Sequence, residues 1–90
     1  MRIISQDGKF DIPYDSVLVY VSSVFPKEIH VDFVAYRATY IVGQYDSEED
    51  ALYVMKCIRY NMRRGSDYFF MPSAEDASAW RQEAAEGGEL

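Results

Sequence analysis

The chain has 90 residues, of which 49% are hydrophobic and 16% aromatic, and its formal net charge is −6. This composition is typical of one small globular domain and excludes a disordered chain. A single cysteine excludes an internal disulfide and suits a reducing compartment. No apolar run approaches the roughly 20 residues of a membrane span, and the first residues lack a signal-peptide core. We therefore expect a cytoplasmic protein that does not enter a membrane.

The acidic residues are concentrated near the C-terminus. Residues 73–90 contain five acidic residues against Arg81 alone, a net charge of −4, whereas residues 1–72 carry −2. Because affinity for nucleic acid comes mainly from cations that neutralise phosphates, this balance disfavours direct nucleic-acid binding. We expect a single α+β domain over residues 1–72 and an acidic C-terminal tail over residues 73–90. The tail is either a solvated segment or a surface that competes with nucleic acid for a basic partner.

The first half of the chain predicts an antiparallel meander of about five strands. Asp7-Gly8 is a hairpin signal, and Pro13 ends the second strand because proline lacks the N–H that a strand ladder needs. The later strands are indicated by a β-branched run and by a stretch in which apolar and polar side chains alternate. The strands are expected over residues 2–5, 9–12, 17–23, 28–35 and 38–44.

Residues 45–65 predict one long helix with signals at both ends. Ser47 is an N-cap candidate, Asp50 stands three residues later where its side chain can complete a capping box, and Gly65 can close the helix in the left-handed conformation. Apolar residues at helical spacing indicate a face that packs on the sheet. These residues are Ala51, Met55, Ile58 and Met62, with Leu52 and Val54 beside them.

Two further elements are expected after this helix. Residues 67–72 form an aromatic run that suits an edge strand, and Ser73 is a second N-cap candidate, which allows a short helix over residues 74–85. The predicted fold is thus α+β, with the meander packed by one long helix and a short C-terminal element. Because so small a chain has a marginal core, we also expect a homo-oligomer.

No residue cluster in the sequence predicts catalysis, a metal site or a cofactor. The single histidine, His30, lies in the middle of a strand without other ligands at metal spacing, and Cys57 is interpreted as a packed thiol. The acidic residues 46–50 could suggest a divalent metal, but helix capping already accounts for them. We therefore predict that the protein is not an enzyme and uses no cofactor.

The basic end of the helix is the candidate ligand-binding site. Guanidinium groups bind phosphates and aromatic rings stack on bases, so a small nucleotide would suit this combination. The candidate phosphate-binding residues are Arg59, Arg63 and Arg64, and the candidate stacking residues are Tyr60, Tyr68 and Phe69. The alternative is that the arginines only pair with the helix dipole and the aromatics only pack in the core. The eight tyrosines also suit a protein-binding surface.

Three segments together carry a resemblance to known proteins. The opening MRIISQDGKFDIPY, the join GQYDSEEDALYVMKCIR and the segment FFMP resemble small, largely uncharacterised proteins of Gram-positive bacteria, their phages and mobile elements. Such proteins typically open with MRIISQ and then Asp or Asn before Gly, and carry YSTEEKA in the helix. The likeness covers roughly residues 1–72 and implies no mechanism.

A second resemblance is to phage anti-Thoeris sponge proteins, which sequester cyclic ADP-ribose signals. The shared features are the RIIS opening followed by Gly-Lys and the G-x-Y-D-S-E-E start of the helix. The resemblance implies a phage or mobile-element protein in a bacterial host cell that counters defence by sequestering a cyclic nucleotide signal. The alternatives are an acidic, anti-CRISPR-like inhibitor that binds a host defence nuclease, and an interaction module with no role in defence.

Overall fold

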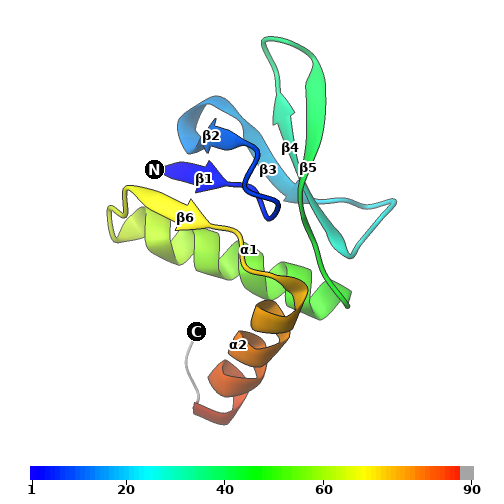
Figure 1. The fold of residues 1–90 in the computed structure, drawn as a ribbon, viewed down its shortest axis with the longest axis vertical. Helices are drawn as coiled ribbons and strands as arrows, with labels where there is room; N and C mark the ends of the chain where they lie inside the picture. Colours follow the sequence, from blue (N-terminus) through cyan, green and yellow to red (C-terminus); the bar gives the residue numbers. More distant parts are fainter. Residues whose placement is uncertain (88–90) are drawn as a thin grey trace.

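The structure, a computed structural model, describes residues 1–87 and contains six strands and two α-helices in that range. Figure 1 shows their arrangement. The strands are β1 (Arg2–Ile4), β2 (Asp11–Pro13), β3 (Leu18–Val21), β4 (Glu28–Phe33), β5 (Ala38–Gln44) and β6 (Tyr68–Phe70). The helices are α1 (Glu48–Arg63) and α2 (Ala74–Gly87), and a single 3₁₀ turn, Tyr14–Ser16, joins β2 to β3.

The strands form two small sheets, so the α+β class is confirmed and the single five-stranded meander is wrong. One sheet has the order β3-β4-β5 and is antiparallel throughout. The other has the order β2-β1-β6, in which β1 pairs antiparallel with β2 and parallel with β6. The 3₁₀ turn separates the β1–β2 hairpin from β3, and β6 returns from the far end of the chain to the free edge of β1.

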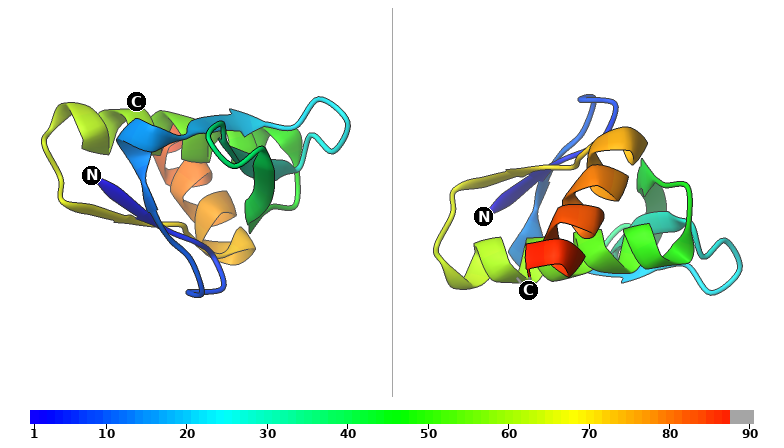
Figure 2. Two further views of the ribbon diagram at one scale, coloured as in Figure 1. Left: turned by 90° about the horizontal axis from the view of Figure 1, so that it is seen from above. Right: turned by 90° about the horizontal axis from the view of Figure 1, so that it is seen from below.

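The core lies between the two sheets and α1. Each sheet directs one row of aliphatic side chains inward, as alternation along a strand requires. The fully buried aliphatic residues are Ile3, Ile12, Ile29, Val31, Val42, Val54 and Ile58. Figure 2 shows α1 running along one side of the molecule, with β1 and β6 lying across from it.

Both predicted ends of α1 are confirmed by their hydrogen bonds. The Ser47 hydroxyl accepts from the backbone N–H of Asp50 at 3.1 Å. At the other end Gly65 has φ +74°, its N–H donates to the Met62 carbonyl, and the N–H of Ser66 donates to the Asn61 carbonyl. This pair of bonds is the Schellman arrangement, which satisfies carbonyls that the helix leaves without partners.

The buried face of α1 is rotated from the predicted one. Ala51, Val54 and Ile58 are buried as expected, whereas Leu52 and Met62 are exposed. The buried face instead extends to Asp50 and Cys57, and α2 packs against α1 with Ser78 and Arg81 in contact with Asp50. A helix that contacts both a sheet and a second helix buries a wider arc than its apolar stripe predicts.

A buried carboxylate joins the two helices. Asp50 is 1% exposed; its side chain accepts a 2.5 Å hydrogen bond from Ser78 Oγ and a 2.5 Å bond from Arg81 Nε, both on α2. The predicted capping-box role of Asp50 is therefore replaced by this contact with α2. Burial by itself raises the pKa of Asp50, but the hydrogen bonds from Ser78 and Arg81, the Arg81 charge and the Ser47 hydroxyl outweigh it and lower the pKa below its ordinary value.

The segment after Pro72 is thus part of the folded body as far as it is described. Ser73 caps α2 by accepting from the N–H of Asp76 at 3.0 Å, and Ala77 is fully buried. The remaining residues of the expected acidic tail, 88–90, lie outside the described residues.

Gln6 connects both sheets to the start of α2. Its N–H donates to the Val42 carbonyl, and its side chain accepts from the N–H of Gln44 at 2.8 Å. The same side chain donates to the carbonyls of Gln44 and Pro72, each at 3.0 Å. Gln6 follows β1 in the turn that Asp7-Gly8 predicts, and this turn spans four residues between Ser5 and Phe10, whose backbones are hydrogen-bonded.

Candidate phosphate-binding groove on helix α1

A shallow groove of about 320 Å³ lies on the outward face of α1. It is lined by Lys56, Arg59, Tyr60 and Arg63, which are all exposed. These residues recur at spacings of three and four along the helix, so their side chains project from one face. The groove therefore brings together three of the six predicted site residues and adds Lys56.

The cations of this groove have no acidic partner within the described chain. Ion pairs over residues 1–87 join Arg2 to Asp11, His30 to Glu28 and Arg81 to Asp50, and none includes Lys56, Arg59, Arg63 or Arg64. Lys56, Arg59, Arg63 and the C-cap residue Arg64 thus lie within about two turns at the end of α1, in a chain whose net charge is −6.

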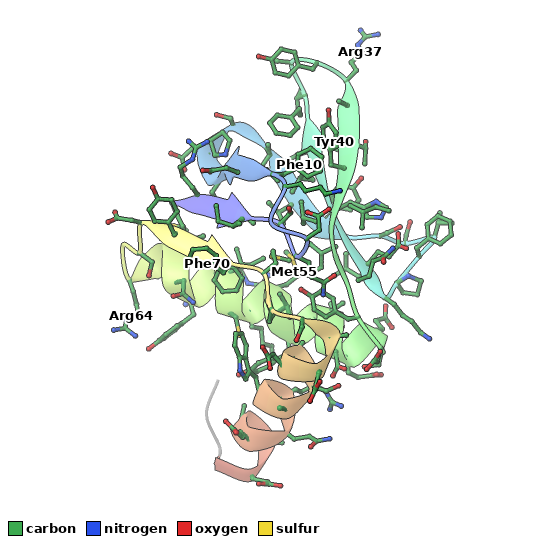
Figure 3. The ribbon with its side chains drawn as sticks, viewed as in Figure 1. Phe10, Arg37, Tyr40, Met55, Arg64 and Phe70 are labelled. Carbon is green, nitrogen blue, oxygen red and sulfur yellow. The ribbon has the colours of Figure 1, made fainter. Side chains whose placement is uncertain are left out.

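Arg64 borders the groove through its contact with Tyr60. Its guanidinium carbon lies 5.4 Å from the centre of the Tyr60 ring, and its Nη1 atom donates to the Tyr60 hydroxyl at 3.4 Å. This cation–π contact holds the ring at the end of the groove, where Tyr60 is 44% exposed. Figure 3 shows the Arg64 side chain projecting outward from the C-terminal end of α1.

The two candidate aromatics beyond the helix do not lie in the groove. Phe69, the middle residue of β6, is 6% exposed and packs in the hydrophobic core, so its ring is inaccessible to a ligand. Tyr68 is exposed on β6 and stacks with Phe70, the ring centres being 6.4 Å apart. Alternation along the strand sends Phe69 inward and Tyr68 outward, which a run of three aromatic residues does not reveal by its composition.

Lys56 is the groove residue that the sequence analysis missed. It precedes Arg59 by three residues and Arg63 by seven, so helical spacing alone was a sufficient signal. The neighbouring residue Cys57 does not line the groove. Cys57 is buried, and burial raises the pKa of its thiol, with a small opposing effect from a hydrogen bond to Tyr53.

His30 pairs with a carboxylate on its own strand. The Nε2 atom of His30 lies 2.9 Å from a carboxylate oxygen of Glu28 on the same strand. Across residues 1–87, no group of three or more His, Cys, Asp or Glu side chains is placed to hold a metal ion. Neither of the helices described is both long enough and apolar enough to cross a membrane.

A second hollow of about 230 Å³ lies between the two sheets and is aromatic. Phe10 contacts Tyr40 at 4.9 Å between ring centres, Phe33 contacts Tyr40 at 5.7 Å, and Phe33 contacts Tyr36 at 6.2 Å. Figure 3 shows Phe10 beside Tyr40 and Arg37 at the tip of the β4–β5 hairpin. Its one lining carboxylate, Asp11, already pairs with Arg2, so this hollow lacks the unpaired charge that distinguishes the groove on α1.

Comparisons of this chain with protein-family models, with curated proteins and with solved structures found no match.

Proposed function

We propose that this protein binds a small phosphate-bearing nucleotide on the outward face of α1 and holds it without chemical change. The observation that carries the proposal is the set of cations at the groove, which have no acidic partner over residues 1–87. In a folded protein with excess negative charge, clustered unpaired cations repel one another unless an anion or solvent neutralises them. A bound phosphate would do so.

The groove offers a distinct role to each kind of side chain. Arg59 and Arg63 supply planar donors that match two phosphate oxygens, and Lys56 adds a compact charge. Tyr60 supplies a ring face for a base, held in place by Arg64. The lining contains no Ser, Cys, His, Asp or Glu side chain, and we assign Lys56 and Tyr60 to binding the nucleotide.

The resemblance to phage and mobile-element proteins supplies the setting of the proposal. In that setting the ligand is a cyclic nucleotide immune signal of a bacterial host, and the protein counters host defence by lowering the free concentration of the signal. Sequestration of this kind requires only that the protein bind the signal tightly and be present in sufficient amount.

The test is a thermal-shift screen against cyclic dinucleotides, cyclic trinucleotides and cyclic ADP-ribose isomers. A ligand at 100 times its dissociation constant adds about 2.7 kcal/mol to the free energy of unfolding, which raises the Tm of so small a domain by several degrees. Added salt should weaken the binding, because the contacts are exposed and ionic. Recovery of the intact nucleotide after denaturing the complex would show that it is held unchanged.

The matched variants are Arg63→Ala in the groove and Lys27→Ala outside it. Both remove one exposed cation, but Lys27 lies before β4, and its carbonyl accepts from the N–H of Tyr45 just before the N-terminal end of α1, whereas the groove is formed by residues 56–63 further along the helix. Loss of one charge-assisted hydrogen bond is worth about 1.5–3 kcal/mol, so Arg63→Ala should weaken binding by roughly tenfold or more, and Lys27→Ala should not. Equal affinity for the two variants would remove the proposed site.

A second function is favoured by the charge of α2. Its one basic residue, Arg81, is engaged by Asp50, so the exposed charged side chains of the helix are all acidic: Glu75, Asp76, Glu83 and Glu86. Figure 1 shows α2 extending away from the sheets, where it would meet the basic groove of a protein such as a defence nuclease. This function predicts that Glu83→Lys with Glu86→Lys abolishes inhibition. Sequestration through α1 predicts that inhibition survives these changes.

A further inference from the structure

The outer edge of β6 has unpaired backbone groups. The N–H of Arg2 donates to the Asp67 carbonyl at 2.8 Å, and the N–H of Met71 donates to the Ile4 carbonyl at 3.0 Å. Because backbone direction alternates along a strand, residues 67, 69 and 71 face β1, and Tyr68 and Phe70 face away from it. Neither backbone group of Tyr68 or of Phe70 has a hydrogen-bond partner over residues 1–87.

This free edge is closed at both ends. Pro72 has no N–H, and its carbonyl accepts from the Gln6 side chain and from the Tyr45 hydroxyl. At the other end, the N–H of Ser66 is used in the helix cap, where it donates to the Asn61 carbonyl. The edge therefore presents two N–H and two C=O groups, all on Tyr68 and Phe70. A longer extended peptide would run past both ends without finding the donors it needs.

We propose that a second copy of this chain pairs with this edge, β6 against β6, in the antiparallel direction about a two-fold axis at Phe69. In that register Tyr68 of one copy lies opposite Phe70 of the other, and each such pair exchanges two N–H···O bonds. The N–H and C=O groups of Tyr68 and Phe70 on both edges are then all satisfied. The product is a continuous sheet with the strand order β2-β1-β6-β6-β1-β2.

The side chains at the edge fit the same register. Tyr68 is 54% exposed and Phe70 is 68% exposed, and their rings lie on the outer face of β6. In the paired sheet each Tyr68 ring faces the Phe70 ring of the second copy, a favourable cross-strand pair. In the view of Figure 3 the Phe70 ring lies on the side of β6 opposite β1. An exposed aromatic edge of this kind associates unless it is covered, and natural proteins otherwise protect such edges with charged residues.

The test compares Phe70→Pro with Phe70→Thr by sedimentation equilibrium and native mass spectrometry. Both variants remove the ring, but only proline removes the outward N–H, and neither alters the hydrogen bonds between β6 and β1. The wild-type protein should be a dimer at micromolar to millimolar concentration. Phe70→Pro removes two interface hydrogen bonds per dimer and should dimerise roughly tenfold to a hundredfold more weakly than Phe70→Thr.

A second measurement uses the wild-type chain and so does not depend on the folding of a variant. The amides of Tyr68 and Phe70 should become protected from hydrogen exchange as concentration rises, while the amide of Phe69 is protected at every concentration. A monomer at millimolar concentration, or fast exchange at Tyr68 and Phe70 in a dimer, would overturn the pairing. Arg63→Ala should leave the dimer intact, so the two proposals succeed or fail separately.

Discussion

Replacing Arg81 with alanine tests whether the buried carboxylate of Asp50 fixes α2 to the rest of the protein. The Asp50 side chain is almost fully enclosed and accepts 2.5 Å hydrogen bonds from Ser78 and Arg81. Arg81→Ala leaves the carboxylate buried with the Ser78 bond alone from α2. When a buried charge loses its hydrogen-bonded partner, the free energy of unfolding falls by more than the same ion pair would contribute at a solvent-exposed site.

The expected loss is smaller than that for a fully enclosed ion pair. Removing a hydrogen bond to a charged group costs about 1.5–3 kcal/mol. The Arg81 side chain is 39% exposed, so water already screens part of its charge. We expect a loss of about 2 kcal/mol at neutral pH, which lowers the Tm of a chain of this length by roughly 10 °C.

The pH dependence has a defined sign. The pKa of Asp50 is lowered in the folded state, so its stabilising effect is present above the unfolded pKa of about 3.9 and is lost as the pH falls through the lowered value. The difference between wild type and Arg81→Ala should therefore be constant near neutral pH and shrink below about pH 4.

The assay is chemical denaturation of wild type, Arg81→Ala, Asp50→Asn and the double variant over this pH range. The coupling free energy from the cycle should be about 1–2 kcal/mol at neutral pH and should fall on acidification. Gln82→Ala, an exposed position next to Arg81 on α2, is the matched control. If Arg81→Ala and Gln82→Ala have equal stability and the same pH profile, Asp50 does not hold α2 in place.

Three further outcomes follow from single side chains. Gln6→Ala removes the side-chain hydrogen bonds that link the turn after β1 to Gln44 of β5 and to Pro72 before α2. It should lower the free energy of unfolding by about 1–3 kcal/mol in a denaturant titration, and an unchanged midpoint would contradict this. Gly43→Ala places a Cβ 2.7 Å from the hydroxyl oxygen of the buried Tyr45, so it should lower the free energy of unfolding by about 1–3 kcal/mol. The control is Ile41→Ala at an exposed position of the same strand, and equal melting temperatures for the two variants would refute the clash. Cys57 is buried with a raised pKa, so it should react with a thiol reagent slowly in the native state and rapidly in denaturant. Fast labelling of the native protein would show that the core around Cys57 opens readily.

Local sequence signals correctly predicted the ends of α1 and the position of the first hairpin, although its turn spans four residues and not the two that Asp7-Gly8 indicates. The ends of α1 depend on Ser47 and Gly65, each of which acts on backbone groups within a few residues. The alternation in β4 and the turn at Asp7-Gly8 are similarly local. The groove on α1 was partly predictable for the same reason, because the spacing of Arg59 and Arg63 along a helix places them on one face.

Sequence by itself therefore determined the elements of this protein, the α+β class and the basic face of α1. Tertiary structure decided the division into two sheets, the parallel pairing of β6 with β1, the burial of Phe69 and the role of Asp50. Each of these depends on contacts between residues far apart in the chain. The residue pattern of a strand shows which of its side chains are apolar. It does not show which strand will lie beside it, because the backbone N–H and C=O groups at a strand edge can pair with those of any other strand. The partner is selected only when the whole core packs.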